Sequence, residues 1–319
     1  MKIIVSGGCG FIGSHLCEKL IECGHNVLCV DNCATGKMKN IKQLMDNPLF
    51  TFVNHNIQHD LTLPDGFIPC QIYHMACPAS PKYYQNNSLE TLLTNIYGTI
   101  NMLNIAVKHK ARFLLASTSE VYGDPLISPQ NEEYWGNVNP VGVRSCYDEG
   151  KRVSETLCLE YNRMKKVDVR IARIFNTYGP KLHQEDGRVI SNFIIQSINN
   201  TNITVYGNGF HTRSFCYISD QINGLIKLMN MNNIDEHPVM IINIGNPQEI
   251  TINDLANLII KLTDSKSKIV HMSLPLDDPK KRNPDISKAK HYLNWEPIVH
   301  LEDGLIKTIE YFRSEYFRI

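Results

Sequence analysis

Short apolar runs alternate with amphipathic stretches along the first half of the chain. The apolar runs cover residues 2–7, 26–32, 51–57, 71–76, 111–118 and 167–174, and their length is typical of buried strands. Apolar residues recur at helical spacing over 14–24, 89–108 and 148–164. Strands that alternate with helices predict an α/β fold, in which a doubly wound parallel sheet is covered by helices on both faces.

The pattern is looser after residue 176. It predicts a helix over 189–199, strands at 203–207 and 215–220, and a helix near 224–230. After residue 241 it predicts one strand, two helices and a loop over 277–285. We therefore predict a Rossmann domain over 1–175, with 214–245 returning to it, and a smaller, partly interleaved substrate domain over 176–319.

Three glycines connect the first predicted strand to the first predicted helix. Gly7, Gly10 and Gly13 form the pattern G-x-x-G-x-x-G, and Phe11 and Ile12 open the helix. Glycine lets the backbone turn tightly and approach a pyrophosphate, and the helix N-terminus offers free N–H groups to that charge. The strand–turn–helix setting predicts a dinucleotide site.

Asp31 ends the second predicted strand, 18 residues after Gly13. A carboxylate at this point accepts the hydroxyls of the adenosine ribose and repels a 2′-phosphate, which favours NAD over NADP. The alternative is that the glycines only turn the chain and Asp31 caps a loop. Asn32, Thr35 and Gly36 are expected to complete the adenosine side, and Ala76 ends a later strand at the edge where ligands bind.

Tyr147 and Lys151 lie one helical turn apart, on one face of a predicted helix. A lysine ammonium and a positive nicotinamide would lower the pKa of the phenol, so that Tyr147 could take a proton from a substrate hydroxyl. Tyr and Lys at this spacing also occur by chance in surface helices.

Three polar residues, Thr118 to Glu120, lie at the end of the apolar strand at 111–118. Thr118 or Ser119 can hydrogen-bond the reacting oxygen, and Glu120 adds a carboxylate near the same point. Each has a plainer interpretation: the hydroxyls could cap the strand end, and Glu120 could form a solvated salt bridge. The joint arrangement with Tyr147 and Lys151 favours an oxidoreductase-type site.

Composition limits the partners of the chain. Its 319 residues carry 32 basic and 32 acidic side chains, so neither nucleic acid nor an anionic membrane is an expected partner. The ten cysteines show no zinc-type spacing, so we predict no metal site and reduced thiols. Met1 directly precedes the first apolar run, and no run approaches the ~20 residues needed to cross a bilayer, so we expect a cytoplasmic protein.

The motifs GGCGFIG, STSEVYG, YDEGK and RIFNTYGP together resemble the extended short-chain dehydrogenase/reductase family, which acts on nucleotide sugars. The longer runs MACPASPKYY, YWGNVNP, DGRVISNF, TVYGNG and DDPKKRNPDI are similar to its UDP-glucuronate decarboxylase branch, and the similarity spans nearly the whole chain. The resemblance implies NAD as a tightly held cofactor. It also implies decarboxylation of UDP-glucuronate to UDP-xylose by oxidation at C4, loss of CO2 and re-reduction.

Two residues separate the branches of this family. Related 4,6-dehydratases carry an Asp where this chain has Ser119, and a serine cannot protonate the leaving C6 hydroxyl. The decarboxylases place an arginine where Arg282 stands, and its planar fork suits a carboxylate. Arg282 could instead clamp a phosphate or be a surface charge. The alternatives that remain are a 4,6-dehydratase, a 4-epimerase, a decarboxylase that releases a UDP-4-keto-pentose, and a catalytically silent NAD-binding regulator.

The resemblance also implies further site residues and a homodimer with a four-helix interface formed by the helices at 89–108 and 148–164. Asn56, Ile57 and Thr177 would contact the cofactor, and the substrate residues would be Pro78, Tyr84, Asn176, Arg188, Asn192, Tyr206 and Arg213 together with Ser119 and Arg282. The chain departs from the family at Asn56, where Asp is usual, and at Leu93, where a lysine is usual; the second change could weaken phosphate binding.

Overall fold

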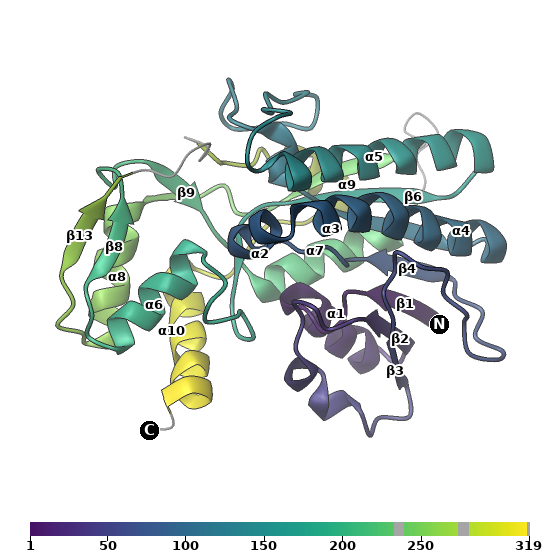
Figure 1. Ribbon diagram of the computed structural model, residues 1–319, viewed down its shortest axis with the longest axis horizontal. Coiled ribbons are helices and arrows are strands. Elements are labelled where there is room, and N and C mark those ends of the chain that lie inside the picture. Colours follow the sequence, from purple (N-terminus) through teal and green to yellow (C-terminus); the bar gives the residue numbers. More distant parts are fainter. Residues whose placement is uncertain (233–238, 274–280, 318–319) are drawn as a thin grey trace.

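The computed structural model describes residues 1–232, 239–273 and 281–317, and its centre is a seven-stranded sheet (Figure 1). All neighbouring strands in this sheet are parallel, in the order β11-β6-β5-β4-β1-β2-β3. The strands are β1 (Lys2–Ser6), β2 (Asn26–Asp31), β3 (Phe50–Asn54), β4 (Gln71–His74), β5 (Arg112–Thr118), β6 (Val169–Ile174) and β11 (Met240–Ile244). The predicted doubly wound parallel sheet is confirmed.

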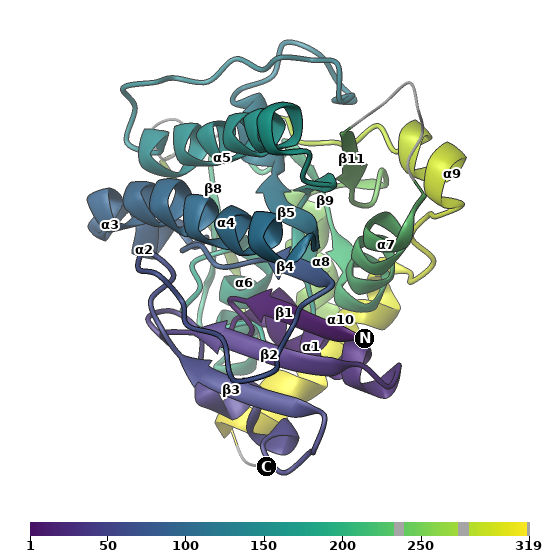
Figure 2. The ribbon, with the colours of Figure 1, turned by 90° about the vertical axis from the view of Figure 1, so that its right-hand side faces the viewer.

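Side chains on successive positions of each strand enter different cores. Ile3 and Val5 of β1 pack in one apolar cluster with α1 (Phe11–Glu22) and α7 (Ile218–Asn230). Ile4 packs in another, with α4 (Thr99–His109) and α5 (Ser145–Lys165). Because both faces are covered by helices, each strand reads as a continuous apolar run. Figure 2 shows α4 and α5 side by side on one face, with α7 on the other.

The single helix predicted over 89–108 is three consecutive helical segments. These are α3 (Ser88–Leu93), the π-helical turn η3 (Thr94–Gly98) and α4. The carbonyl of Asn95 accepts a hydrogen bond of 2.9 Å from the Ser154 hydroxyl of α5, and a Cβ on Gly150 would lie 2.8 Å from the Asn95 amide. The predicted helical stretch is confirmed, with a π turn inside it that the sequence did not predict and that contacts α5.

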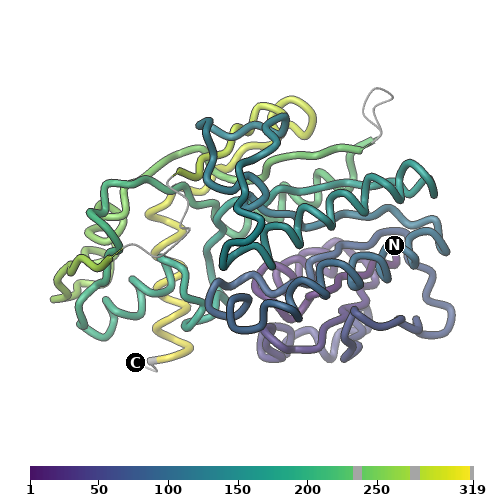
Figure 3. The backbone as a smooth tube through the Cα atoms, turned by 45° about the horizontal axis from the view of Figure 1, so that its top comes forward, coloured from purple at the N-terminus to yellow at the C-terminus, as the bar shows by residue number. Residues whose placement is uncertain are grey.

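The second half forms three small two-stranded sheets, which pair β7 (Thr177–Tyr178) with β10 (Cys216–Tyr217), β9 (Thr212–Ser214) with β12 (Glu249–Thr251), and β8 (Ile203–Tyr206) with β13 (Ile269–Met272). The further helices of the second half are α6 (Val189–Ile198), α8 (Ile252–Thr263), α9 (Ser287–Leu293) and α10 (Leu301–Phe312). The short helix α2 (Pro81–Asn86) belongs to the first half. The tube in Figure 3 lets the reader trace the backbone from this region back to the main sheet.

Two predictions for the second half were wrong. The strand expected over 215–220 is only Cys216–Tyr217, because Ile218 opens α7, whose apolar residues lie at helical spacing. The region after 241 holds more elements than predicted, namely β11, β12, β13, α8, α9 and α10. Residues 277–280 of the expected loop lie outside the described residues. Within the described part of the chain, no helix is both long enough and apolar enough to cross a membrane.

Candidate active site

The glycine turn packs so closely that side chains are excluded from it. A Cβ on Gly13 would lie 2.1 Å from the carbonyl oxygen of Gly7, and one on Gly7 would lie 2.7 Å from the backbone of Ala76. Gly7 also has a φ of +77°, which disfavours other residues. Gly10 precedes α1 without any side-chain cap, so the helix begins with its N-terminal N–H groups facing the turn.

Asp31 both shapes a loop and faces the cavity described below. Its two carboxylate oxygens accept hydrogen bonds from the backbone N–H groups of Cys9, at 2.9 Å, and Cys33, at 2.7 Å. The loop-capping alternative is therefore real, and it does not exclude the ribose role, since each oxygen keeps further lone-pair capacity. Burial raises the pKa of Asp31, while the two N–H donors lower it.

One cavity of about 760 Å³ runs from the glycine turn along the carboxyl ends of β1, β4, β5 and β6 into the second half of the chain. This edge holds the switch point between β1 and β4, where ligands bind in doubly wound sheets. Every residue predicted for the site lines this cavity: on the cofactor side Gly7, Gly10, Phe11, Ile12, Gly13, Asp31, Asn32, Thr35, Gly36, Asn56, Ile57, Ala76 and Thr177; on the substrate side Pro78, Tyr84, Asn176, Arg188, Asn192, Tyr206 and Arg213; and between them Thr118, Ser119, Glu120, Tyr147, Lys151 and Arg282.

Tyr147 and Lys151 lie together in α5, and both are buried. The ammonium of Lys151 lies 6.0 Å from the centre of the Tyr147 ring and donates a 2.8 Å hydrogen bond to the carbonyl of Ala116 in β5. The phenol ring of Tyr147 also stacks on the ring of Tyr84, with 5.0 Å between the ring centres and an interplanar angle of 2°. The phenol is therefore fixed between a helix and a strand end.

The predicted lowering of the Tyr147 pKa is not found in the protein alone. Burial raises the pKa of this phenol far above its usual range, and the nearby Cys77 raises it further. A hydrogen bond with Thr118 and the charge of Arg188 act in the opposite direction. The prediction included a positively charged nicotinamide, and the protein groups without it do not produce a phenolate at neutral pH.

Glu120 lies between two guanidinium groups. Its Oε2 accepts a hydrogen bond of 3.1 Å from Arg282 and a second from Arg144. Arg282 is only 2% exposed and also donates to the carbonyl of Ser119 at 2.6 Å, so the surface-charge interpretation of Arg282 was wrong. Burial disfavours the charged carboxylate, yet the charges of Arg282 and Arg144 outweigh it and hold the pKa of Glu120 below its usual range.

Arg144 is a site residue that the sequence reasoning missed, and Asp148 is its partner beside the site. Arg144 precedes α5, lines the cavity, and lies 3.8 Å from the carboxylate of Asp148. Asp148 is buried, and its Oδ1 has no hydrogen-bond partner among the described residues. Burial first, and Glu120 second, raise the pKa of Asp148 to about 7. The spacing of Arg144 three residues before Tyr147 could have indicated that both lie on one face.

The remaining substrate-side residues line the part of the cavity formed by the second half. Arg188 donates to the carbonyl of Ala79 at 3.0 Å and pairs with Asp186, which joins this part to the loop after β4. Arg213 lies in β9, and Tyr206, at the end of β8, is 45% exposed. The cationic side chains of Arg188 and Arg213 and the exposed ring of Tyr206 line this part of the cavity, and these groups suit an anionic ligand that carries a planar base, such as a nucleoside diphosphate.

The sheet edge under the cavity is held by a buried polar network. His74 at the end of β4 hydrogen-bonds Ser6 of β1 at 2.8 Å and Thr99 of α4 at 3.2 Å. Burial lowers the pKa of His74 to about 3, so the ring is neutral and bridges the two hydroxyls. The network connects both strands of the switch point to the helix above them.

These residues fit NAD. A Cβ would fill the turn that has to receive a pyrophosphate, α1 begins there without a side-chain cap, and Asp31 stands at the ribose position with a carboxylate that disfavours a 2′-phosphate.

Comparison with known proteins agrees with the fold. The family model described as GDP-mannose 4,6 dehydratase matches residues 4–308. UDP-glucuronic acid decarboxylase 1 of Xenopus tropicalis is 52% identical over 314 residues, which cover 98% of this chain and 72% of that protein. UDP-glucuronic acid decarboxylase 3 of Arabidopsis thaliana is also 52% identical, over 98% of this chain and 89% of that protein.

Solved structures give the same picture at lower identity. The UDP-glucuronic acid 4-epimerase of Bacillus cereus, in complex with UDP-glucuronic acid and NAD, superposes with a TM-score of 0.88 at 28% identity, over 99% of this chain and 100% of that one. The UDP-glucose 4-epimerase of Thermotoga maritima, with UDP-glucose, also has a TM-score of 0.88 at 28% identity, over 98% of this chain and 99% of that one.

The sheet, the glycine turn and the Tyr147–Lys151 pair define an NAD-dependent enzyme of the extended short-chain dehydrogenase/reductase class that modifies nucleotide sugars. Within that class, the chain belongs to the family of UDP-glucuronic acid decarboxylases.

Proposed function

We propose that this enzyme converts UDP-glucuronate to UDP-xylose and CO2. The observation that carries the proposal is the cluster of Glu120, Arg282 and Arg144, which lines the same cavity as Tyr147. Its two guanidinium groups face the carboxylate of Glu120 and that of Asp148, whose pKa is raised to about 7 by burial and by Glu120. While Asp148 is protonated the cluster carries a net positive charge, so it can accept the carboxylate of a uronic acid. The absence of an acid at Ser119 supports decarboxylation over 4,6-dehydration.

The reaction begins at Tyr147, which takes the proton from the C4 hydroxyl. When bound on the glycine turn and Asp31, NAD supplies the hydride acceptor at C4 and the donor that later restores the hydroxyl. Thr118 and the charge of Arg188 lower the pKa of the phenol and so favour the phenolate during the proton transfer, and the Lys151 ammonium lies 6.0 Å from the ring centre.

The ketone at C4 is β to the carboxylate, and this position makes loss of CO2 possible. As the bond from C5 to the carboxylate breaks, its electron pair passes to the ring as an enolate. Arg282, Glu120 and Ser119 orient the ring and carboxylate, and a proton then adds at C5. Arg188, Asn192, Tyr206, Arg213, Asn176, Pro78 and Tyr84 would hold the nucleotide sugar in the substrate half of the cavity.

The proposed reaction is tested by incubating the purified protein with UDP-glucuronate and identifying the products by mass spectrometry. We expect CO2 and a UDP-pentose, with no net consumption of NAD. Products that keep the carboxylate would make the chain a 4-epimerase and overturn the proposal. A UDP-4-keto-pentose as the end product would retain decarboxylation and overturn the return of hydride.

We also propose the finer points of organisation. The division into a Rossmann domain over 1–175, with 214–245 returning, and a substrate domain over 176–319 is supported by the pairing of β11 with β6. A homodimer through the helices α3–η3–α4 and α5 is supported by exposed apolar side chains at Tyr97, Val107 and Val153. A cytoplasmic location is supported by the free thiols of the ten cysteines.

A further inference from the structure

Four cysteine thiols lie in a row beside the adenosine end of the cavity. Cys9 stands in the glycine turn and Cys33 follows β2, while Cys29 and Cys17 lie behind them in β2 and α1. Neighbouring thiols raise one another's pKa along this row: Cys29 raises that of Cys9, Cys17 raises that of Cys29, and burial together with Cys9 raises that of Cys33. None of these thiols has a role in the proposed reaction.

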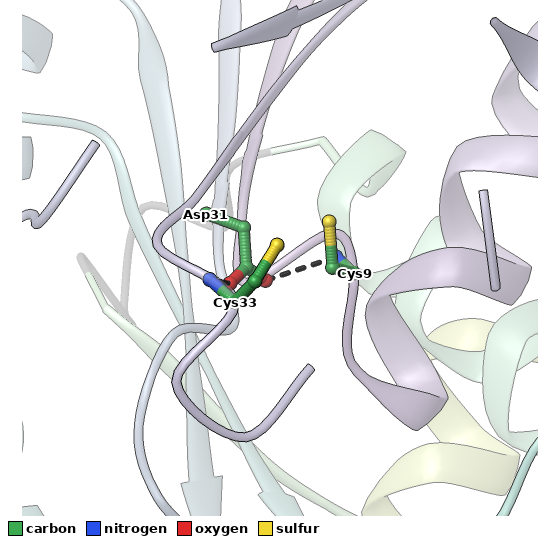
Figure 4. A group of neighbouring side chains, drawn as sticks. All are labelled: Cys9, Asp31 and Cys33. Atoms are coloured by element: carbon green, nitrogen blue, oxygen red, sulfur yellow. Dashed lines mark hydrogen bonds between the residues drawn. The ribbon is translucent and has the colours of Figure 1, made fainter. Parts of the chain in front are cut away.

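A carboxylate, that of Asp31, lies beside the thiols of Cys9 and Cys33. The thiols of Cys9 and Cys33 and a carboxylate oxygen of Asp31 all lie within 4.8 Å of one another. Figure 4 shows the three side chains coming from two separate loops, with both sulfur atoms pointing the same way. The N–H groups of Cys9 and Cys33 fix the orientation of the Asp31 carboxylate, so small movements of the two thiols would complete the donor set.

We propose that Cys9, Cys33 and Asp31 form a binding site for a thiophilic divalent cation of the zinc type, and that this ion competes with NAD. Two thiolates and one carboxylate are a ligand set typical of Zn²⁺, with a water in the fourth position. At zinc–ligand distances of about 2.0–2.3 Å, the donors around one tetrahedral ion stand roughly 3.5–3.8 Å apart. A disulfide would instead require the two sulfurs to approach to about 2.05 Å.

Charge can be balanced when an ion binds at this cluster. A divalent ion displaces both thiol protons to solvent and compensates three negative ligands, beside the positive N-terminal end of α1.

Competition follows from Asp31. Two of the roughly four acceptor positions of the Asp31 carboxylate are taken by the N–H groups of Cys9 and Cys33. A metal ion would take a third, so the two ribose hydroxyls could not both be accepted, and ion and cofactor compete. This step alone rests on the proposed function, because it uses Asp31 as the ribose acceptor. Binding of the ion to the chain does not depend on the reaction that the enzyme performs.

The test is a titration of the full-length chain, freed of nucleotide, with Co²⁺. We expect the near-ultraviolet thiolate-to-cobalt charge-transfer band and the visible spectrum of a four-coordinate ion. Zn²⁺ should remove this signal by displacement. The variants Cys9→Ser and Cys33→Ser should each lose most of the band, whereas Cys23→Ser, which removes an exposed thiol at the end of α1, should keep it.

A second measurement needs no variant. Saturating NAD should suppress the cobalt band, and Zn²⁺ at ten times its own Kd should raise the apparent Kd of NAD about 11-fold, as competition for one site requires. A band that Cys23→Ser weakens as much as Cys33→Ser would overturn the site, and so would the absence of any band. A band that NAD leaves unchanged would overturn the competition. Neither result depends on decarboxylase activity, so failure here is distinguishable from failure of the proposed function.

Discussion

At the scale of single residues, the site is built around a phenol that the fold positions but does not ionise. Tyr147 is stacked on Tyr84, hydrogen-bonded with Thr118 and close to the Lys151 ammonium. Burial nevertheless raises its pKa, so the protein alone keeps the phenol protonated. The base is therefore expected to form only when positive charge is added next to it.

Replacement of Tyr147 tests this role. We expect Tyr147→Phe to lower kcat by about 10²–10⁴-fold, the usual contribution of a general base, while NAD still binds. Steady-state kinetics with UDP-glucuronate and an NAD titration measure the two effects. The matched control is Tyr161→Phe in the same helix, whose hydroxyl bonds Asn104 at 2.8 Å away from the cavity and whose loss should leave kcat unchanged. Full activity of Tyr147→Phe would remove this residue from the mechanism.

The raised pKa of Asp148 predicts that the stability of the fold depends on pH. Its pKa rises from 3.8 to about 7 on folding, so the neutral form stabilises the fold at low pH, and this contribution is lost as the pH rises through about 7. Asp148→Asn keeps the neutral shape. We expect its free energy of unfolding to exceed that of the wild type by about 1–3 kcal/mol at roughly pH 8.

Below pH 4 the difference should vanish, because Asp148 is then neutral in both states. Urea unfolding at both pH values measures this, and the exposed Asp65→Asn should show no such trend. Equal stability of Asp148→Asn and wild type at high pH would mean that the pair with Arg144 compensates the burial of this carboxylate.

At the scale of elements, the glycine turn and α1 form one unit. A methyl group on Gly13 would meet the Gly7 carbonyl at 2.1 Å, so the helix and the turn would have to separate. We expect Gly13→Ala to lower the free energy of unfolding by about 1–3 kcal/mol, the usual effect of overpacking, and to weaken NAD binding at least about tenfold. Denaturant unfolding and calorimetry measure the two. Glu22→Ala, exposed in the same helix, should change neither.

Element boundaries in the Rossmann half followed well from the sequence, and those in the second half did not. A strand of the main sheet is buried on both faces, so its apolar run is continuous and easily recognised. β13 has two exposed residues out of four and pairs only with β8, so nothing in its pattern separates it from a loop. The π turn η3 depends on a contact with α5, which no local pattern contains.

At the scale of the whole molecule, the proposed dimer depends on the outer face of the helices α3–η3–α4 and α5, which contact each other within the chain. We expect the protein to be dimeric in solution and Tyr97→Glu to shift it towards the monomer, since a charge would be buried at the interface. Light scattering during gel filtration measures the mass. Ile298→Glu, at an exposed apolar position outside these helices, should leave the dimer intact. A monomeric wild-type chain would contradict the interface.

The sequence by itself determined the parallel sheet, the NAD turn, the Tyr147–Lys151 pair and the presence of Arg282, because each depends on spacing within one segment or on a long motif. Only the tertiary structure decided which charges meet. Arg282 reaches Glu120 and Ser119 across more than 160 positions, and Arg144 completes the same cluster. It also brought Cys9, from the glycine turn, to Asp31 and Cys33 at the end of β2. The physical reason is common to both cases: electrostatic and coordination partners are set by distance in space, and burial determines the protonation states of the groups that meet there.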